Sequence, residues 1–93
     1  QQSESPLYHS GSIIRELRND MREAGFDSVA TLPFPQPVYP SGWWSVTLAG
    51  KSTNVESFRE EAAASHEMPL QYYTVDAHRG ALALPPFMRK AFA

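Results

Sequence analysis

Pro37-Val38-Tyr39-Pro40-Ser41-Gly42-Trp43-Trp44 is the stretch of sequence that decides the predicted fold. Its two prolines each hold φ at about −65° and remove a backbone donor, and Gly42 tolerates positive φ. The stretch therefore predicts a stiff, bent loop that holds the Tyr39 ring in a fixed direction. A phenol in such a place is suited to contact a ligand. The alternative is a tyrosine that covers a hydrophobic edge and keeps its hydroxyl in water.

Two predicted strands flank this loop. Aromatic and β-branched residues over positions 43–49 are typical of a strand, and positions 29–34 predict another. Prolines 33, 35 and 37 cannot donate to a ladder, so the first strand is expected to be short, to end at a sheet edge or to leave the sheet. The connection is too short for a helical crossover, and the two strands are therefore predicted to pair antiparallel.

Periodicity and capping residues predict the helices. Apolar residues recur three or four positions apart between residues 13 and 24, which indicates a helix over 12–24 that ends at Gly25. The capping box Thr53-x-x-Glu56 predicts a second helix over 54–65. A short extended piece over 70–73 and a helical turn over 75–84 follow, and Pro85-Pro86 begins a last helix.

Length and composition limit the class of protein. The chain has 93 residues, a net charge of −2 and no cysteine, so we expect one small domain without disulfides or thiolate metal sites. The near-neutral charge favours neither a nucleic-acid partner nor a membrane-surface partner. The three histidines are far apart and no metal-binding spacing occurs. Without an apolar run of membrane length or a signal-peptide pattern, the cytoplasm is the simplest predicted location.

The predicted strands are too few for a complete sheet. Two strands do not form a stable open sheet with both faces covered, and residues 43–49 are too apolar for a strand with one face in water. We therefore expect further strands from sequence outside these residues or from another copy of the chain. A chain that begins at Gln1 instead of methionine fits a processed protein or a fragment of something longer.

Other polar residues allow only open predictions. Glu4 is either a structural hydrogen-bond acceptor or a contact to a cation. Asp76, His78 and Arg79 are close enough in sequence for a charge relay. More often such a group only fixes a C-terminal segment in place, and this is the prediction we prefer.

Three sequence blocks together resemble a known family. They are Gln2-Ser3-Glu4-Ser5-Pro6, Tyr39-Pro40-Ser41-Gly42-Trp43-Trp44-Ser45 and residues 72–87. In order and spacing they resemble the C-terminal part of the polyamine aminopropyltransferases, the spermidine synthase family, in which the first block ends a central strand. The resemblance implies an α/β fold: the C-terminal part of a Rossmann-like, methyltransferase-type sheet with an antiparallel strand pair, flanking helices and a helical tail.

The resemblance also implies an activity. The family moves an aminopropyl group from decarboxylated S-adenosylmethionine to putrescine. By position, Gln2 would contact the amine acceptor through its side-chain carbonyl, Tyr39 would orient the attacking nitrogen, and Pro40 would line the nucleoside pocket. The family's glycine-rich donor loop and catalytic aspartate lie upstream and have no counterpart here. Residues 1–93 would thus be a C-terminal segment without a catalytic residue, which alone binds no donor and catalyses no transfer.

Departures from the family pattern leave alternatives open. Thr74 stands where the family has asparagine, and Gly80 and Leu82 alter its tail motif, so the packing of the tail is expected to differ. A non-catalytic dimerising module with the same fold is one alternative. A domain-swapped homodimer, in which copies complete each other's sheet, is another.

Overall fold

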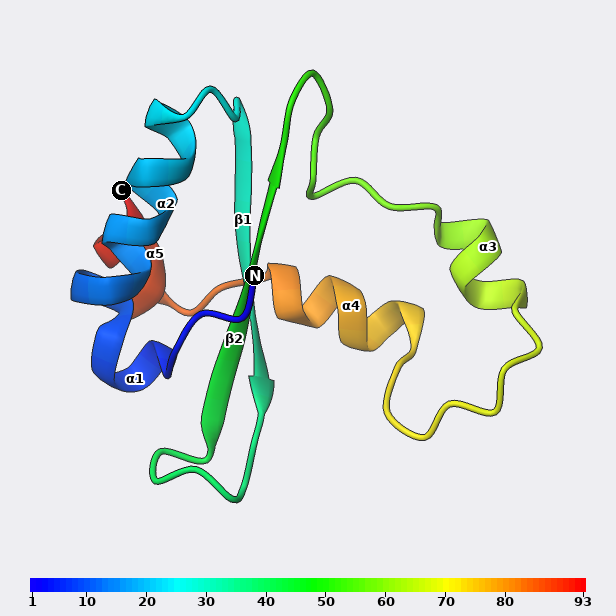
Figure 1. Ribbon diagram of the computed structural model, residues 1–93. Helices are drawn as coiled ribbons and strands as arrows, with labels where there is room; N and C mark the ends of the chain where they lie inside the picture. The colour runs from blue at the N-terminus through cyan, green and yellow to red at the C-terminus, as the bar shows by residue number, and fades with distance from the viewer.

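The computed structural model describes residues 1–93 as two strands and six helical segments (Figure 1). The strands form one antiparallel sheet with helices packed against it, which confirms the α/β class and the antiparallel pair. In chain order the elements are α1 (Pro6–His9), the π-helix η1 (Ser10–Ile14), α2 (Arg15–Glu23), β1 (Ser28–Pro35), β2 (Trp43–Gly50), α3 (Glu60–Ser65), α4 (Val75–Leu82) and α5 (Pro86–Phe92).

β1 is an outer strand. It pairs with β2 from Ser28 opposite Gly50 to Pro35 opposite Trp43, and no strand lies on its other side. Prolines are accepted in an edge strand, where a missing N–H can face outward. Of the possibilities that the sequence left open, the structure shows the one in which the proline end lies at a sheet edge.

The first three residues lie along the opposite side of β2. The Ser3 N–H donates to the Ser45 carbonyl over 2.8 Å, and the Thr47 N–H donates to the Gln1 carbonyl over 2.8 Å. Gln2 faces Val46 in an antiparallel bridge. Over this part of its length β2 therefore lies between β1 and residues 1–3. Residues 1–3 occupy the position expected for the end of a third strand.

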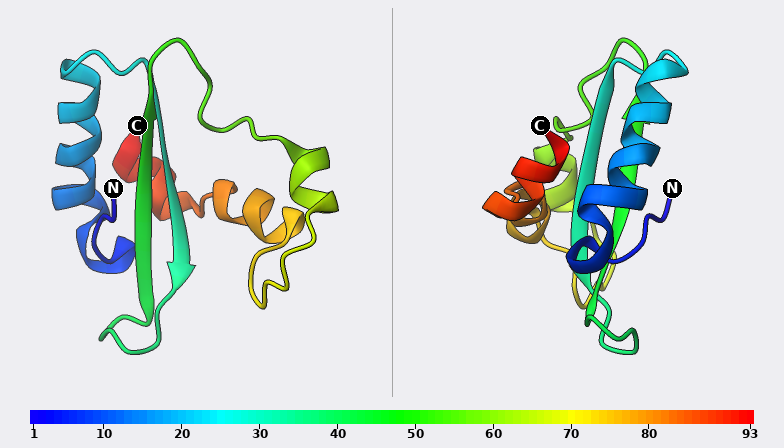
Figure 2. Two further views of the ribbon diagram at one scale, coloured as in Figure 1. Left: turned by 45° about the vertical axis from the view of Figure 1, so that its right-hand side comes forward. Right: turned by 90° about the vertical axis from the view of Figure 1, so that its left-hand side faces the viewer.

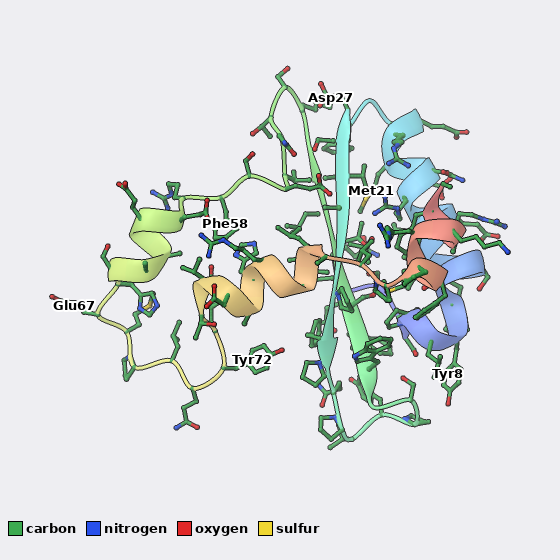
Figure 3. All side chains as sticks on the ribbon, turned by 180° about the vertical axis from the view of Figure 1, so that it is seen from behind. Tyr8, Met21, Asp27, Phe58, Glu67 and Tyr72 are labelled. Atoms are coloured by element: carbon green, nitrogen blue, oxygen red, sulfur yellow. The ribbon has the colours of Figure 1, made fainter.

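The helices cover the two faces of the sheet unequally. α1, α2 and α5 lie on one face, and α4 lies on the other, against β1 (Figures 1 and 2). The linker from α4 to α5 passes the outer edge of β1 and so changes face. α3 and the segments around it, which carry Phe58, Glu67 and Tyr72, extend away from the sheet (Figure 3).

The hydrophobic core is thin. Twelve of the 93 residues are buried, seven of them polar or charged, and the buried hydrophobic side chains are Ile14, Ala30 and Met88. The chain exposes 6286 Å², whereas a compact monomer of its 10.4 kDa would expose about 5,400 Å². Its radius of gyration is 13.8 Å, against about 12 Å for a compact domain of this length. The elements thus present surface that no part of this chain covers.

The predicted start of the first helix was wrong. Helical structure begins at Pro6 instead of residue 12 and continues through the wide turn of η1 into α2. Proline is favoured in a first helical turn, where its missing N–H removes no bond. Ser10 lies inside the helix and donates its hydroxyl to the Pro6 carbonyl over 2.5 Å.

The capping box was also misinterpreted. Residues 54–59 are not helical, and the helix is confined to α3, Glu60–Ser65. The Val55 N–H donates to Ser28 Oγ and the Glu56 N–H donates to Asn54 Oδ1, each over 3.0 Å. These side chains accept the N–H groups that the Thr53 hydroxyl would have capped in a helix beginning at residue 54, which is consistent with the irregular backbone here.

The tail follows the sequence prediction except over residues 70–73, which form no strand. α4 occupies Val75–Leu82, and Thr74 caps it by accepting a hydrogen bond from the Ala77 N–H over 2.9 Å. α5 begins at Pro86, as predicted. No helix in the chain combines the length and the apolar character needed to span a membrane.

Candidate functional site

The N-terminal segment turns sharply at Glu4. Its φ of 42° is left-handed, a conformation that costs a non-glycine residue on the order of 1 kcal/mol and persists only where neighbours hold it. The Glu4 carbonyl accepts a hydrogen bond from Ser45 Oγ over 2.8 Å. This turn ends the pairing of residues 1–3 with β2 and directs the chain into α1. The Glu4 backbone is thus a structural acceptor, and the role of its side chain stays a prediction.

A buried row of hydroxyl groups holds this segment to the sheet. Arg18 Nη1 donates to Thr31 Oγ1 over 2.9 Å, and Thr31 Oγ1 lies 3.0 Å from Thr47 Oγ1. Ser3 Oγ bridges Thr47 Oγ1 and Ser45 Oγ, each at 2.8 Å. The row therefore connects α2, β1, β2 and the N-terminal segment through side-chain hydrogen bonds, although the buried Nε of Arg18 has no partner.

The charge at the end of this row is partly compensated by an aromatic ring. Burial lowers the pKa of the Arg18 guanidinium, and the nearby cation of Arg22 lowers it further, while Glu56 acts in the opposite direction. The Arg18 side chain stays cationic at neutral pH, since a guanidinium is not deprotonated in proteins. Its guanidinium carbon lies 4.3 Å from the centroid of the Phe92 ring, which favours the charged form by a cation–π interaction.

The Tyr39 loop is closed by its own backbone hydrogen bonds. The Gln36 N–H donates to the Gly42 carbonyl over 2.7 Å, and the Gly42 N–H donates to the Tyr39 carbonyl over 2.8 Å. Gly42 adopts a φ of 72°. The Tyr39 ring lies on Trp44 with centroids 4.6 Å apart and keeps 40% of its surface exposed. The predicted bend of the loop is confirmed, and contact of the phenol with a ligand stays a prediction.

A hydroxyl bridge connects this loop to the N-terminal turn. Ser5 Oγ donates to Ser41 Oγ over 2.7 Å, between residues 36 positions apart in the chain. Ser41 Oγ in turn donates to the Trp43 carbonyl over 2.9 Å and accepts from the Trp43 N–H over 3.1 Å. The two segments that carry the predicted site residues are thus held together.

Gln2 and Tyr39 belong to the same face of the sheet. Gln2 lies opposite Val46, so its side chain shares the face of Val46 and Trp44. The Tyr39 ring packs on Trp44, and Pro40 is exposed beside it. The structure therefore brings Gln2 and Tyr39 to one side of β2, with Pro40 next to Tyr39 in the loop. They line none of the five principal cavities, so within this chain their face is open.

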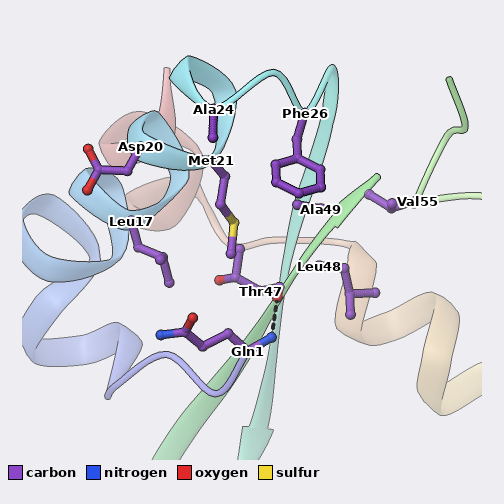
Figure 4. A pocket seen from close by; sticks show the side chains of 10 residues that line it. All are labelled: Gln1, Leu17, Asp20, Met21, Ala24, Phe26, Thr47, Leu48, Ala49 and Val55. Carbon is purple, nitrogen blue, oxygen red and sulfur yellow. Dashed lines mark hydrogen bonds between the residues drawn. The ribbon is translucent and has the colours of Figure 1, made fainter. Parts of the chain in front are cut away.

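The largest hollow lies elsewhere, along β2 beyond Gln1 (Figure 4). It has a volume of about 730 Å³ and lies between α2 and the end of β2. The Gln1 amino group closes one end by donating to the Thr47 carbonyl over 2.9 Å. We call this hollow the β2 groove; its lining residues are Gln1, Leu17, Asp20, Met21, Ala24, Phe26, Thr47, Leu48, Ala49 and Val55.

The charged tail residues are structural. Arg79 donates to Asp76 over 3.1 Å and pairs with Glu60, whose hydrogen bond raises the pKa of Arg79. His78 Nδ1 bonds the Tyr73 hydroxyl over 2.7 Å. Histidine and aspartate therefore do not form a relay, and the group holds α3 and the segment after it against α4. No three acidic or histidine side chains come together as a metal site.

No protein-family model matches the chain. The polyamine aminopropyltransferase of Xanthomonas axonopodis pv. citri is 51% identical over 92 residues, an alignment that covers 98% of this chain and 32% of that protein. The enzyme of the same name from Xanthomonas campestris pv. campestris strain B100 shows the same identity and coverage. The chain thus spans about a third of the length of the curated relatives it matches.

Two solved structures share the fold. A crystal structure of spermidine synthase from Thermotoga maritima superposes with a TM-score of 0.83 and 27% identity, covering 98% of this chain and 31% of that one. A spermidine synthase in complex with the transition-state analogue AdoDATO gives 0.80 at 24% identity, covering 98% and 32%. Along nearly its whole length the chain is therefore similar to about one third of a polyamine aminopropyltransferase, which confirms the resemblance carried by its three sequence blocks.

Proposed function

We propose that residues 1–93 are the C-terminal segment of a polyamine aminopropyltransferase, which transfers an aminopropyl group from decarboxylated S-adenosylmethionine to putrescine or a similar diamine. The observation that carries the proposal is the 51% identity over 92 residues to enzymes of that name. In this reaction the amine nitrogen forms a bond to the carbon beside the sulfonium, the carbon–sulfur bond breaks, and the nitrogen loses a proton.

The larger sheet implied by this function is Rossmann-like. The β2 groove supports it, because a strand that continued the pairing of residues 1–3 would run along β2 through this groove. The surface of the chain, about 900 Å² larger than that of a compact monomer, is consistent with such a covering element. The donor loop and the catalytic aspartate would then belong to sequence outside residues 1–93, and this chain alone would neither bind the donor nor catalyse transfer.

Within this chain we assign the acceptor contacts to two side chains. The Gln2 carbonyl would accept a hydrogen bond from the diamine, and the Tyr39 hydroxyl would orient the attacking nitrogen directly or through water. Pro40 would line the nucleoside pocket. The common face of Gln2 and Tyr39 supports this assignment, as does the exposure of the Tyr39 ring. Positioning of this kind raises the effective concentration of the nucleophile at the carbon.

The test uses the full reading frame that contains residues 1–93. We expect the purified protein to form spermidine from decarboxylated S-adenosylmethionine and putrescine, and the 93-residue chain to form none. Gln2→Ala and Tyr39→Phe should each raise KM for putrescine about five- to tenfold, the loss of one hydrogen bond to the diamine. A full-length protein that folds but transfers nothing would contradict the proposal.

An exposed backbone edge favours a second candidate. β2 beyond Thr47 has no partner on the groove side, and such an edge accepts a strand from another copy. A non-catalytic dimerising module or a swapped dimer would use it. The mass in solution separates the cases: a folded dimer of the 10.4 kDa chain supports this candidate, whereas activity of a longer protein supports the transferase.

A further inference from the structure

We propose that Ser41 is a positioning residue for the amine acceptor, acting through its hydroxyl bridge to Ser5. The bridge would fix the Tyr39 loop relative to the segment that carries Gln2. This inference rests on the proposed function and adds to it two serines that touch no reacting atom.

The hydrogen-bonding capacity of Ser41 is completely used. A serine hydroxyl has one proton to donate and two lone pairs to accept. The Ser41 proton goes to the Trp43 carbonyl, and the lone pairs receive the Ser5 hydroxyl and the Trp43 N–H. Since Ser5 is buried, with 5% of its surface exposed, water has poor access to this bond. The bridge therefore has one defined geometry.

The bridge is also the single hydrogen bond between residues 1–5 and loop residues 36–42. The remaining hydrogen bonds of the loop close it on itself or join it to the start of β2. The Gln2 side is anchored independently, because Ser3 bonds Ser45 and Thr47. Loss of the bridge should consequently release the Tyr39 loop while Gln2 keeps its place.

This asymmetry predicts which substrate is affected. The diamine would contact both segments, through Gln2 and Tyr39, whereas the contact assigned to the donor, Pro40, lies on the loop alone. A change in the relative position of the two segments should therefore weaken binding of the diamine more than binding of the donor. A merely structural role would change both KM values or only the stability.

The test measures steady-state kinetics of the full-length protein with putrescine and decarboxylated S-adenosylmethionine. Ser5→Ala removes the bridge alone and should raise KM for putrescine about fivefold, the effect of one neutral hydrogen bond, and leave KM for the donor within about twofold; Ser5 makes no helix-capping bond that would be lost as well. Ser41→Ala breaks the bridge from its other end and also removes two hydrogen bonds to Trp43, so its effect on KM for putrescine should be at least as large. The double variant should be no worse than Ser41→Ala.

Rescue and control variants complete the experiment. Ser41→Thr keeps a hydroxyl and should restore KM for putrescine, and Ser65→Ala, on exposed α3, should change neither KM. The inference is overturned if both KM values rise equally, if both stay unchanged, or if the two single effects add. Absence of transfer by the unmodified protein would instead contradict the proposed function, so the two failures are distinguishable.

Discussion

Gly50 is the last residue of β2, and residues 53–55 fold back against it. A Cβ at this position would lie 2.6 Å from Thr53 Cγ2 and 2.8 Å from Val55 Cγ1, closer than carbon atoms approach one another. Val55 is held in place, because its N–H donates to Ser28 Oγ. The absence of a side chain is therefore required by packing at residue 50.

We expect Gly50→Ala to lower the free energy of unfolding by about 1–3 kcal/mol, the usual effect of overpacking. Urea denaturation of the full-length protein measures it. Gly11→Ala is the matched control, since a Cβ there would meet no atom within 4 Å and alanine favours a helix. Equal stability of the Gly50→Ala protein and the unmodified protein would show that the segment over residues 53–55 moves freely away from β2.

Arg18 is the charged end of the buried hydroxyl row, and its substitution predicts a pH dependence. Burial that lowers the pKa of the arginine should also lower that of a lysine at this position below its ordinary value of about 10.4. The unfolded protein would then bind more protons than the folded one between the two values, so the stability of Arg18→Lys rises with pH there.

The measurement compares the free energy of urea unfolding at about pH 7 and at about pH 9.5, both below the ordinary pKa of lysine. Arg18→Lys should gain stability relative to the unmodified protein as pH rises, because arginine stays charged in both states over this range. Arg15→Lys, at an exposed position of the same helix, should show no such gain. A parallel pH profile for all three proteins would mean that residue 18 is solvated in the folded state.

At the scale of elements, the sequence predicted what depends on local pattern. Both strands, their antiparallel pairing, α4 and α5 follow from aromatic, β-branched and capping residues. The capping box at Thr53 misled because Ser28, distant in sequence, accepts the Val55 N–H that the Thr53 hydroxyl would have capped. The start of the first helix was missed because His9 to Ser12 look like capping residues and the wide turn of η1 has no simple sequence signal.

The candidate site was predictable only in part. Tyr39 was found from its proline loop, whereas Gln2 and Pro40 came from the family resemblance. The Ser5–Ser41 bridge was missed, because it joins residues 36 positions apart and serines in turns have many ordinary uses. The buried hydroxyl row did have a signal in the sequence. Ser45 and Thr47 alternate within β2, which places two hydroxyls on one face of an otherwise apolar strand.

The cap of α4 gives a prediction at this scale. Thr74 accepts a hydrogen bond from the Ala77 N–H, and asparagine, the residue expected here from the family resemblance, is an equally good cap. Thr74→Ala should therefore lower the free energy of unfolding by about 1 kcal/mol, and Thr74→Asn should change it by only about 0.3 kcal/mol. Thermal unfolding of the three proteins is the measurement, and a loss as large for asparagine as for alanine would contradict the capping role.

At the scale of the whole molecule, the prediction concerns the edge of β2 beyond Thr47, which has no hydrogen-bonding partner within this chain. Ser45 and Thr47 use their backbone groups toward residues 1–3, and the alternation of a strand points those of Ala49 the same way, into the β2 groove. If a further strand of the full-length protein lies in the groove, the Ala49 N–H is hydrogen-bonded and covered. We therefore expect its hydrogen exchange in the full-length protein to be as slow as that of the Thr47 N–H, which donates to the Gln1 carbonyl in any case. The contrary result is exchange at Ala49 as fast as at the exposed Lys51, with Thr47 still protected. It would mean that the β2 groove stays open to water and that no further strand of the full-length protein lies in it.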